Sequence, residues 1–113
     1  WLISRRAVDV LQPDIQWSGG LTACRRIALA ADAAGLTVCL HGGANHAFGQ
    51  HFSVAMPNTP WAECFIGSAP GVPLAGAGRL PGTRVPADGC LGLPAGPGFG
   101  LQIDPAWLQP FFT

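Results

Sequence analysis

Two polar residues, Asp14 and His41, stand at the ends of two short segments with strand-forming composition, residues 7–12 and 36–40, with Pro13 between the first segment and Asp14. Between the two segments lies one stretch with the spacing of an amphipathic helix. A strand, a crossover helix and a second parallel strand bring the two strand ends side by side. A carboxylate there can hold one imidazole nitrogen while the other transfers protons, so the spacing predicts an acid–base pair.

Glu63 is the only formally charged residue between Ala33 and Gly78. It lies in an otherwise apolar run, where a buried carboxylate needs a partner, a ligand or a water-filled cavity. Two interpretations stay open for Glu63. It is either an exposed residue at a strand end, or a functional group at the same edge as Asp14 and His41.

The other histidines give a weaker signal. His46 and His51 do not share one helical face with His41, and no H-E-x-x-H pattern is present, so the spacing predicts no metal site. His51 lies on an apolar helical stripe and is expected to be a core or pocket-wall residue. The Gly19-Gly20 pair at a helix start could bind an anion, but tight packing of helix on strand explains these glycines equally well.

The elements that must position these residues alternate between strands and helices. Helical spacing predicts one helix over residues 21–34, stopped by Gly35, and a second helix whose apolar stripe runs from Ala44 to Ala55. Residues 61–66, with Glu63 in the middle, have the pattern of a third strand. This order predicts an α/β fold with three parallel strands and two crossover helices.

The two ends of the chain have less regular patterns. Residues 1–6 resemble the tail of a helix. Residues 67–100 are rich in Gly and Pro, which is typical of irregular, turn-rich chain. Residues 101–103 are expected to form a short strand, and residues 105–108 a short terminal helix.

Composition excludes several classes of protein. Six basic and six acidic residues balance to a net charge of zero, which disfavours nucleic acid and membrane surfaces as partners, and the longest uncharged stretch is too polar to span a membrane. Charged residues make up 11% of the chain, against about 25% in ordinary soluble domains. We interpret the chain, which starts at Trp1, as a piece cut from something larger; a small hydrophobic domain is the alternative.

The absence of lysine and the spacing of the cysteines restrict the possible chemistry further. All six basic residues are Arg, so no Lys is present to act as a Schiff base or general base. The four cysteines show no C-x-x-C pairing or zinc-type spacing. Cys39 and Cys64 lie inside apolar runs and are expected to be reduced, buried packing residues, and a reducing cytoplasm is the expected setting.

Several motifs resemble those of a known family. They are Q-P-D-I-Q-W-S-G-G-L-T at 12–22, H-G at 41–42, P-N-T-P-W-A-E at 57–63 and P-G-F-G at 97–100. In this order they resemble the enolase superfamily, in its mandelate racemase branch, and are most like the L-rhamnonate dehydratase group of acid-sugar dehydratases. The resemblance implies the C-terminal portion of a TIM-type (β/α) barrel. Residues 1–66 would be barrel strands six to eight, and residues 67–113 a segment packing back on the barrel or capping domain.

The resemblance also implies roles. His41 would be a general acid/base, Asp14 its dyad partner, and Glu63 a hydrogen-bond partner of the substrate carboxylate as it becomes an enediolate. In this dehydration a base removes the proton α to the carboxylate of a sugar acid, Mg²⁺ stabilises the intermediate, and the β-hydroxyl leaves as water. The family's Mg²⁺ ligands have no counterpart in this sequence, so they would lie in a missing N-terminal part of the polypeptide. The complete protein is expected to be a homo-oligomer, and this chain alone to be inactive.

Two departures from the family pattern leave the sugar acid open. The stretch from His41 to Glu63 is slightly longer than in rhamnonate dehydratases, and Gly43-Ala44 replaces their usual Ser pair. Three alternatives to the dehydratase also stay open. They are a catalytically inert remnant or interaction module of the same fold, a racemase of the same superfamily, and an anion-binding α/β domain that uses Gly19-Gly20.

Overall fold

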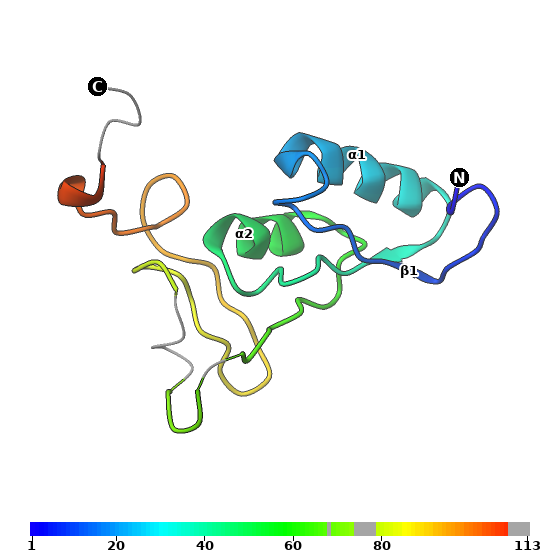
Figure 1. Cartoon of the computed structure of the whole chain (residues 1–113). Helices are drawn as coiled ribbons and strands as arrows, with labels where there is room; N and C mark the ends of the chain where they lie inside the picture. Colours follow the sequence, from blue (N-terminus) through cyan, green and yellow to red (C-terminus); the bar gives the residue numbers. More distant parts are fainter. Residues whose placement is uncertain (68, 74–78, 109–113) are drawn as a thin grey trace.

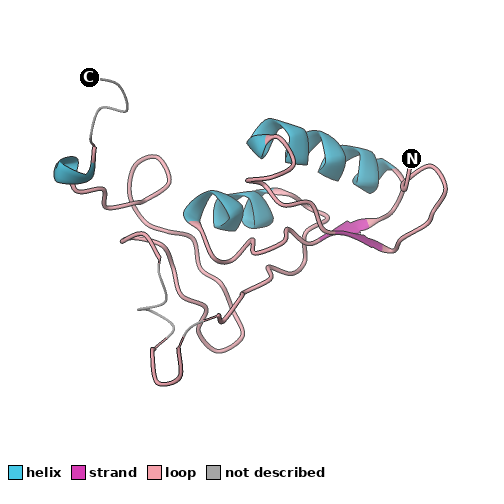
Figure 2. Ribbon diagram, viewed as in Figure 1, coloured by secondary structure: helices cyan, strands magenta, loops and turns pink. Residues whose placement is uncertain are grey.

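A short parallel sheet with a helix packed on it forms one side of the computed structural model, which describes residues 1–67, 69–73 and 79–108 (Figure 1). Strand β1 (Val10–Leu11) is followed by helix α1 (Gly20–Ala33) and strand β2 (Thr37–Val38). The strands are parallel, with Val10 opposite Thr37 and Leu11 opposite Val38 (Figure 2). The predicted strand–helix–strand unit is therefore confirmed, although both strands are shorter than the segments 7–12 and 36–40.

The two chain segments stay together beyond the assigned strand ends. The Cys39 N–H donates to the Leu11 carbonyl at 3.0 Å, and the His41 N–H donates to the Pro13 carbonyl at 3.2 Å. Pro13 has no N–H with which to extend the ladder, so regular pairing stops there. As a result, the residues that follow both strands, Asp14 and His41 among them, emerge at one edge.

Helix α1 buries a narrow face of small residues, Cys24, Ala28 and Ala31. Burial raises the pKa of the Cys24 thiol, and nearby Asp14 adds a smaller effect in the same direction. This thiol therefore acts as a neutral packing group. The helix ends at the predicted Gly35, whose φ of +68° fits the left-handed conformation that commonly terminates helices.

Helix α2 (Ala47–Ala55) begins later than the predicted apolar stripe, because His46 caps it. The His46 Nδ1 accepts a hydrogen bond from the Gly49 N–H at 3.0 Å. The buried face includes two polar residues, Gln50 and Ser53, beside Phe52, whereas Ala55 at the end of the stripe is exposed. The Gln50 side chain is accommodated on this face because its amide donates to the Ala44 and Arg84 carbonyls, at 2.8 and 2.7 Å.

The predicted third strand at residues 61–66 is not assigned as a strand. Across the described residues, the only sheet has two strands. The preceding segment is fastened instead by Asn58, whose carbonyl accepts the Val38 N–H at 2.9 Å and whose side-chain amide donates to the carbonyls of Ala28 and Leu36 at 3.0 and 3.2 Å. A single backbone bond and the bonds of one side-chain amide thus take the place of a continuous ladder, and sequence periodicity does not reveal the side-chain contacts.

The predicted C-terminal segment, residues 67–113, is irregular where it is described; residues 68, 74–78 and 109–113 lie outside the described part. Residues 101–103 form no strand, and a 3₁₀ helix occupies Pro105–Trp107, within the predicted 105–108. At the other end, residues 1–6 are not assigned as a helix, but they have the hydrogen bonds of a helix C-terminus. The Arg5 N–H bonds the Trp1 carbonyl, the Arg6 and Ala7 N–H groups bond the Ile3 and Leu2 carbonyls, and Arg6 has a φ of +48°, as expected for the predicted helix tail.

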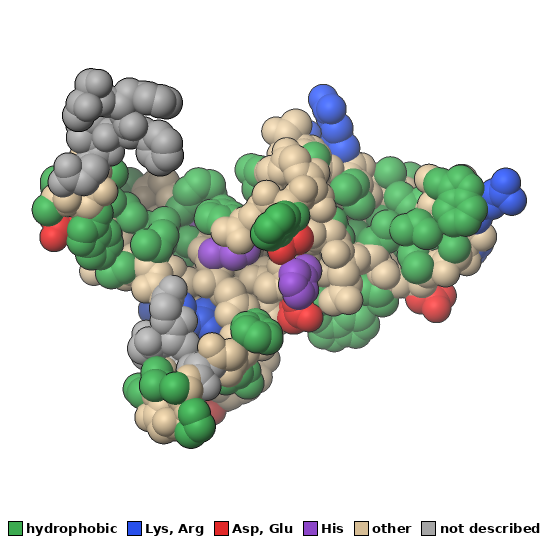
Figure 3. Space-filling model, viewed as in Figure 1, with side chains coloured by type: hydrophobic (Ala, Val, Ile, Leu, Met, Phe, Trp, Pro, Cys, Tyr) green, Lys and Arg blue, Asp and Glu red, His purple; other side chains and the backbone are tan. Residues whose placement is uncertain are grey.

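The chain leaves much apolar surface uncovered. Trp1, Trp17 and Phe65 are 81%, 86% and 68% exposed, and apolar side chains appear over much of the face in Figure 3. The radius of gyration of 15.7 Å exceeds the value of about 13 Å expected for a compact domain of this length. Of the helices in the described part of the chain, none is both long and apolar enough to cross a membrane. The low charge content thus corresponds to apolar faces that the chain does not bury itself.

Candidate active site

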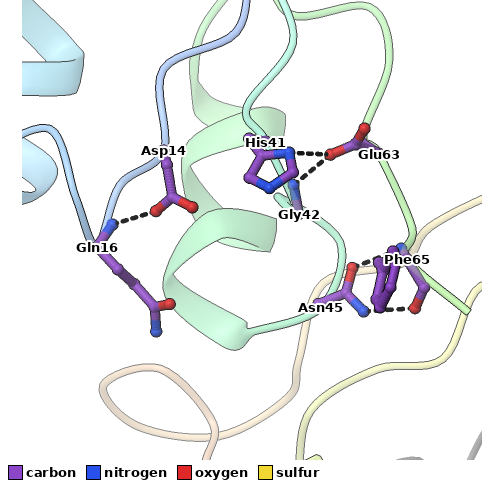
Figure 4. A network of polar contacts seen from close by, with 7 residues as sticks. All are labelled: Asp14, Gln16, His41, Gly42, Asn45, Glu63 and Phe65. Carbon is purple, nitrogen blue, oxygen red and sulfur yellow. Dashed lines mark hydrogen bonds and ion pairs between the residues drawn. The ribbon is translucent and has the colours of Figure 1, made fainter. Parts of the chain in front are cut away.

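His41 and Glu63 form an ion-pair contact at the edge where β2 ends. The His41 Nδ1 lies 2.9 Å from the Glu63 Oε2, and the same oxygen accepts the Gly42 N–H at 2.5 Å (Figure 4). The His41 side chain is 62% exposed and the Glu63 side chain 36% exposed. Because the carboxylate accepts at Nδ1, the Nε2 of His41 stays available for proton exchange with a bound molecule.

Two glycines after His41 make this contact possible. Gly42 has a φ of +59°, which directs its N–H at the Glu63 carboxylate. At Gly43, a Cβ atom would lie 2.9 Å from the Leu40 Cβ, so a side chain there would disturb the end of β2. The H-G-G run thus serves the local backbone geometry that aligns His41 with Glu63.

Asn45 holds the segment that carries Glu63. Its Nδ2 donates to the Phe65 carbonyl at 2.8 Å, and its Oδ1 accepts the Phe65 N–H at 2.7 Å. The Ala44 N–H also donates to the Glu63 carbonyl at 2.8 Å. These three bonds do the fastening that a third strand was predicted to do. No motif in the sequence singled out Asn45, because the contact spans twenty residues of chain.

Asp14 does not make the predicted hydrogen bond to His41. Its Oδ1 accepts the N–H groups of Gln16 and Trp17 at 2.7 and 3.2 Å, which closes a local turn after Pro13. Figure 4 shows Asp14 and Glu63 on opposite sides of the His41 ring. The local turn therefore holds the Asp14 carboxylate, and Glu63 is the group that holds the imidazole.

Most of these residues line a common cavity of about 270 Å³. Asp14, Gln16, His41 and Phe65 are among its lining residues, as are Gly42, Asn45 and His46. Imidazole and carboxylate side chains gather near the middle of the face in Figure 3. The three residues predicted from the sequence, Asp14, His41 and Glu63, thus lie close together. His41 pairs with Glu63, however, and not with Asp14 as predicted.

His46 and His51 occupy different surroundings. Burial lowers the pKa of His46, while Asp14 and the residue's own backbone oppose this to a smaller extent. His51 packs edge-on against Phe99, with ring centroids 5.6 Å apart. Its Nε2 is buried and has no hydrogen-bond partner among the described residues.

The described residues do not fit a magnesium site. They contain no cluster of three or more His, Cys, Asp or Glu side chains placed to hold a metal. Mg²⁺ requires oxygen ligands in near-octahedral geometry. The two nearby carboxylates are already engaged, Glu63 with His41 and Gly42, and Asp14 with the turn that follows it.

A match to a family model gives the class of protein. Residues 1–107 match the family model described as "Enolase C-terminal domain-like", and the chain belongs to this family.

Within the family, the chain is similar to L-rhamnonate dehydratases. It is 37% identical over 101 residues to the L-rhamnonate dehydratase of Saccharopolyspora erythraea, an alignment that covers 86% of this chain and 25% of the relative. Two crystal structures from Gibberella zeae, L-rhamnonate dehydratase and rhamnonate dehydratase complexed with Mg, each superpose with a TM-score of 0.72 at 34% identity. Each superposition covers 93% of this chain, but only 27% and 26% of the two crystal structures. The chain thus spans about a quarter of the length of these relatives.

Proposed function

We propose that this chain supplies part of the active site of an acid-sugar dehydratase of the mandelate racemase branch, with an L-rhamnonate-like sugar acid as substrate. The observation that carries the proposal is the oriented imidazole of His41. It borders a cavity together with Asp14, and a carboxylate fixes one of its nitrogens. The similarity to L-rhamnonate dehydratases supports the choice of substrate class.

The reaction suited to this arrangement is removal of water from a 2,3-dihydroxy acid. The proton on C2 leaves to a base, the electron pair of that C–H bond forms the C2–C3 double bond, and the C3 hydroxyl leaves with a proton as water. The resulting enol takes up a proton at C3 and releases the proton of its C2 hydroxyl, which gives a 2-oxo-3-deoxy acid. The Nε2 of His41 accepts or returns one of these protons, because Glu63 at Nδ1 keeps the ring oriented.

The roles of the two carboxylates stay proposals. Glu63 was predicted to hydrogen-bond the substrate carboxylate, which requires a proton shared between the two carboxyl groups. Its contact with His41 favours an orienting role instead. Asp14, predicted as the dyad partner, can reach the ring only if its side chain or the imidazole rotates, since its Oδ1 is held by the following turn.

The remaining parts of the enzyme would lie outside this chain. We propose that a longer polypeptide supplies an N-terminal part, including the ligands of any Mg²⁺, and that the complete protein assembles as a homo-oligomer. The uncovered apolar faces around Trp1 and Trp17 give a physical reason to expect such a cover. This chain alone is expected to be inactive.

The test is an assay of the longer polypeptide in D₂O with a panel of sugar acids that includes L-rhamnonate. Formation of a 2-oxo-3-deoxy acid is expected, and replacing His41 by Asn should slow it about 10²–10⁴-fold through lost proton transfer. Deuterium at C2 without loss of water would indicate the racemase instead. No reaction with any acid of the panel would indicate the inert remnant or interaction module.

A further inference from the structure

His46 borders two neighbouring cavities. The first, of about 270 Å³, also contains Asp14 and His41 in its wall. The second, of about 240 Å³, has Arg79 and Leu101 among its other lining residues. The His46 ring therefore stands at the boundary between the candidate site and the adjoining hollow, where the far part of an elongated ligand would lie.

The hydrogen bond at the start of α2 fixes the protonation of this ring. A backbone N–H can only donate, so the Nδ1 of His46 must be unprotonated to accept from Gly49 at 3.0 Å. In a neutral imidazole the proton then sits on Nε2, which makes this nitrogen a donor. None of the described residues accepts a hydrogen bond from it.

The charges around the ring do not reverse this state. Asp14 and His41 share one cavity with His46, and Arg79 shares the other. Burial lowers the pKa of His46 more than Asp14 and the backbone raise it. The ring is therefore a neutral donor near pH 7.

Packing also fixes the position of the ring. The imidazole stacks on Phe48 with centroids 4.0 Å apart and an angle of 22° between the planes. A Cβ atom at residue 49 would lie 2.5 Å from the His46 Cε1, so glycine is needed there for the ring to keep this place. A donor held in this way loses little conformational freedom when it binds a ligand.

We propose that His46 is a substrate-binding residue that donates its Nε2–H to a hydroxyl or carboxylate oxygen of the sugar acid, on the side of the substrate away from His41. This inference rests on the proposed dehydratase function and adds a specificity residue to it. His46 would bind without exchanging protons, since losing its neutral state would break the bond to Gly49.

Two substitutions in the longer polypeptide separate this role from a structural one. In His46→Ser the serine hydroxyl can still accept the Gly49 N–H as a helix cap, but it is too short to replace the Nε2–H. We expect a KM for L-rhamnonate raised by about 10- to 100-fold, and a thermal midpoint lowered only by the loss of the Phe48 stack. His46→Asn keeps both a cap acceptor and an N–H donor, so it should recover part of the loss.

The outcomes distinguish this inference from the proposed function. An active wild type with an unchanged KM in His46→Ser would overturn the role of His46 and leave the dehydratase intact. A wild type that dehydrates no sugar acid would reject the proposed function, and the ligand assigned to His46 with it. Nitrogen-15 NMR of the ring gives a direct check, because a proton on Nδ1 at pH 7 would overturn the inference in either case.

Discussion

Replacing Glu63 by Gln tests which carboxylate orients His41. Glutamine keeps the shape of the side chain and an oxygen that can accept the Gly42 N–H, but it removes the negative charge 2.9 Å from the His41 Nδ1. Its amide can also donate a hydrogen bond to a substrate carboxylate. The substitution therefore weakens the orienting role of Glu63 and spares the substrate-binding role that the resemblance implies.

The expected effects on stability and on rate differ in size. The His41 side chain is 62% exposed, so the pair contributes only about 0–1 kcal/mol to the free energy of unfolding. Loss of the orienting charge affects proton transfer directly and should lower kcat about 10²–10⁴-fold. A large loss of rate with an almost unchanged unfolding free energy is therefore the predicted result.

Asp14→Asn is the matched control. Asparagine can accept the N–H groups of Gln16 and Trp17 as aspartate does, so the turn is preserved. We expect it to lower kcat less than tenfold, which is the size of effect expected from removing a charge that does not contact the imidazole. Both variants would be compared by steady-state kinetics and urea unfolding of the longer polypeptide. If Asp14→Asn were the slower enzyme, the assignment to Glu63 would be wrong, and the dyad predicted from the sequence would be restored.

Three further predictions concern folding. Gln50 is fully buried and bonds the Ala44 and Arg84 carbonyls and the Arg84 N–H; Gln50→Leu should therefore cost about 2–4 kcal/mol in urea unfolding, and a loss below 1 kcal/mol would contradict this role. The chain by itself, with Trp1, Trp17 and Phe65 exposed, should aggregate or self-associate in size-exclusion chromatography with light scattering; a monodisperse monomer with a cooperative melt would count against this. Because the pKa of His46 is lower in the folded than in the unfolded chain, the unfolded chain takes up more protons on acidification. Its contribution to stability should be complete above the ordinary histidine pKa of about 6.5 and decline as the pH falls below it, and His46→Ser should flatten this part of the stability–pH curve.

Long-range amide contacts explain why some elements differ from the sequence-based expectation. Residues 61–66 have the composition of a strand, yet no continuous ladder holds this part of the chain. The side-chain amides of Asn45 and Asn58 hold it, together with two single backbone bonds, from the Val38 N–H to the Asn58 carbonyl and from the Ala44 N–H to the Glu63 carbonyl. Gln50 lies on the buried face of α2 for the same reason. Hydrophobic periodicity treats such polar residues as solvent-facing, so the sequence alone gave no indication of their contacts.

The sequence by itself determined the parallel strand–helix–strand unit, the stop at Gly35 and the common edge shared by Asp14 and His41. These features depend on local preferences and on the geometry of a crossover, which short stretches of sequence specify. The tertiary structure alone decided which carboxylate holds His41. That choice depends on the turn that engages Asp14, on the direction of the Gly42 N–H, and on contacts that carry Glu63 across more than twenty residues to the ring. Such a pairing is a competition between nearby partners in space, and their order along the chain does not fix its result.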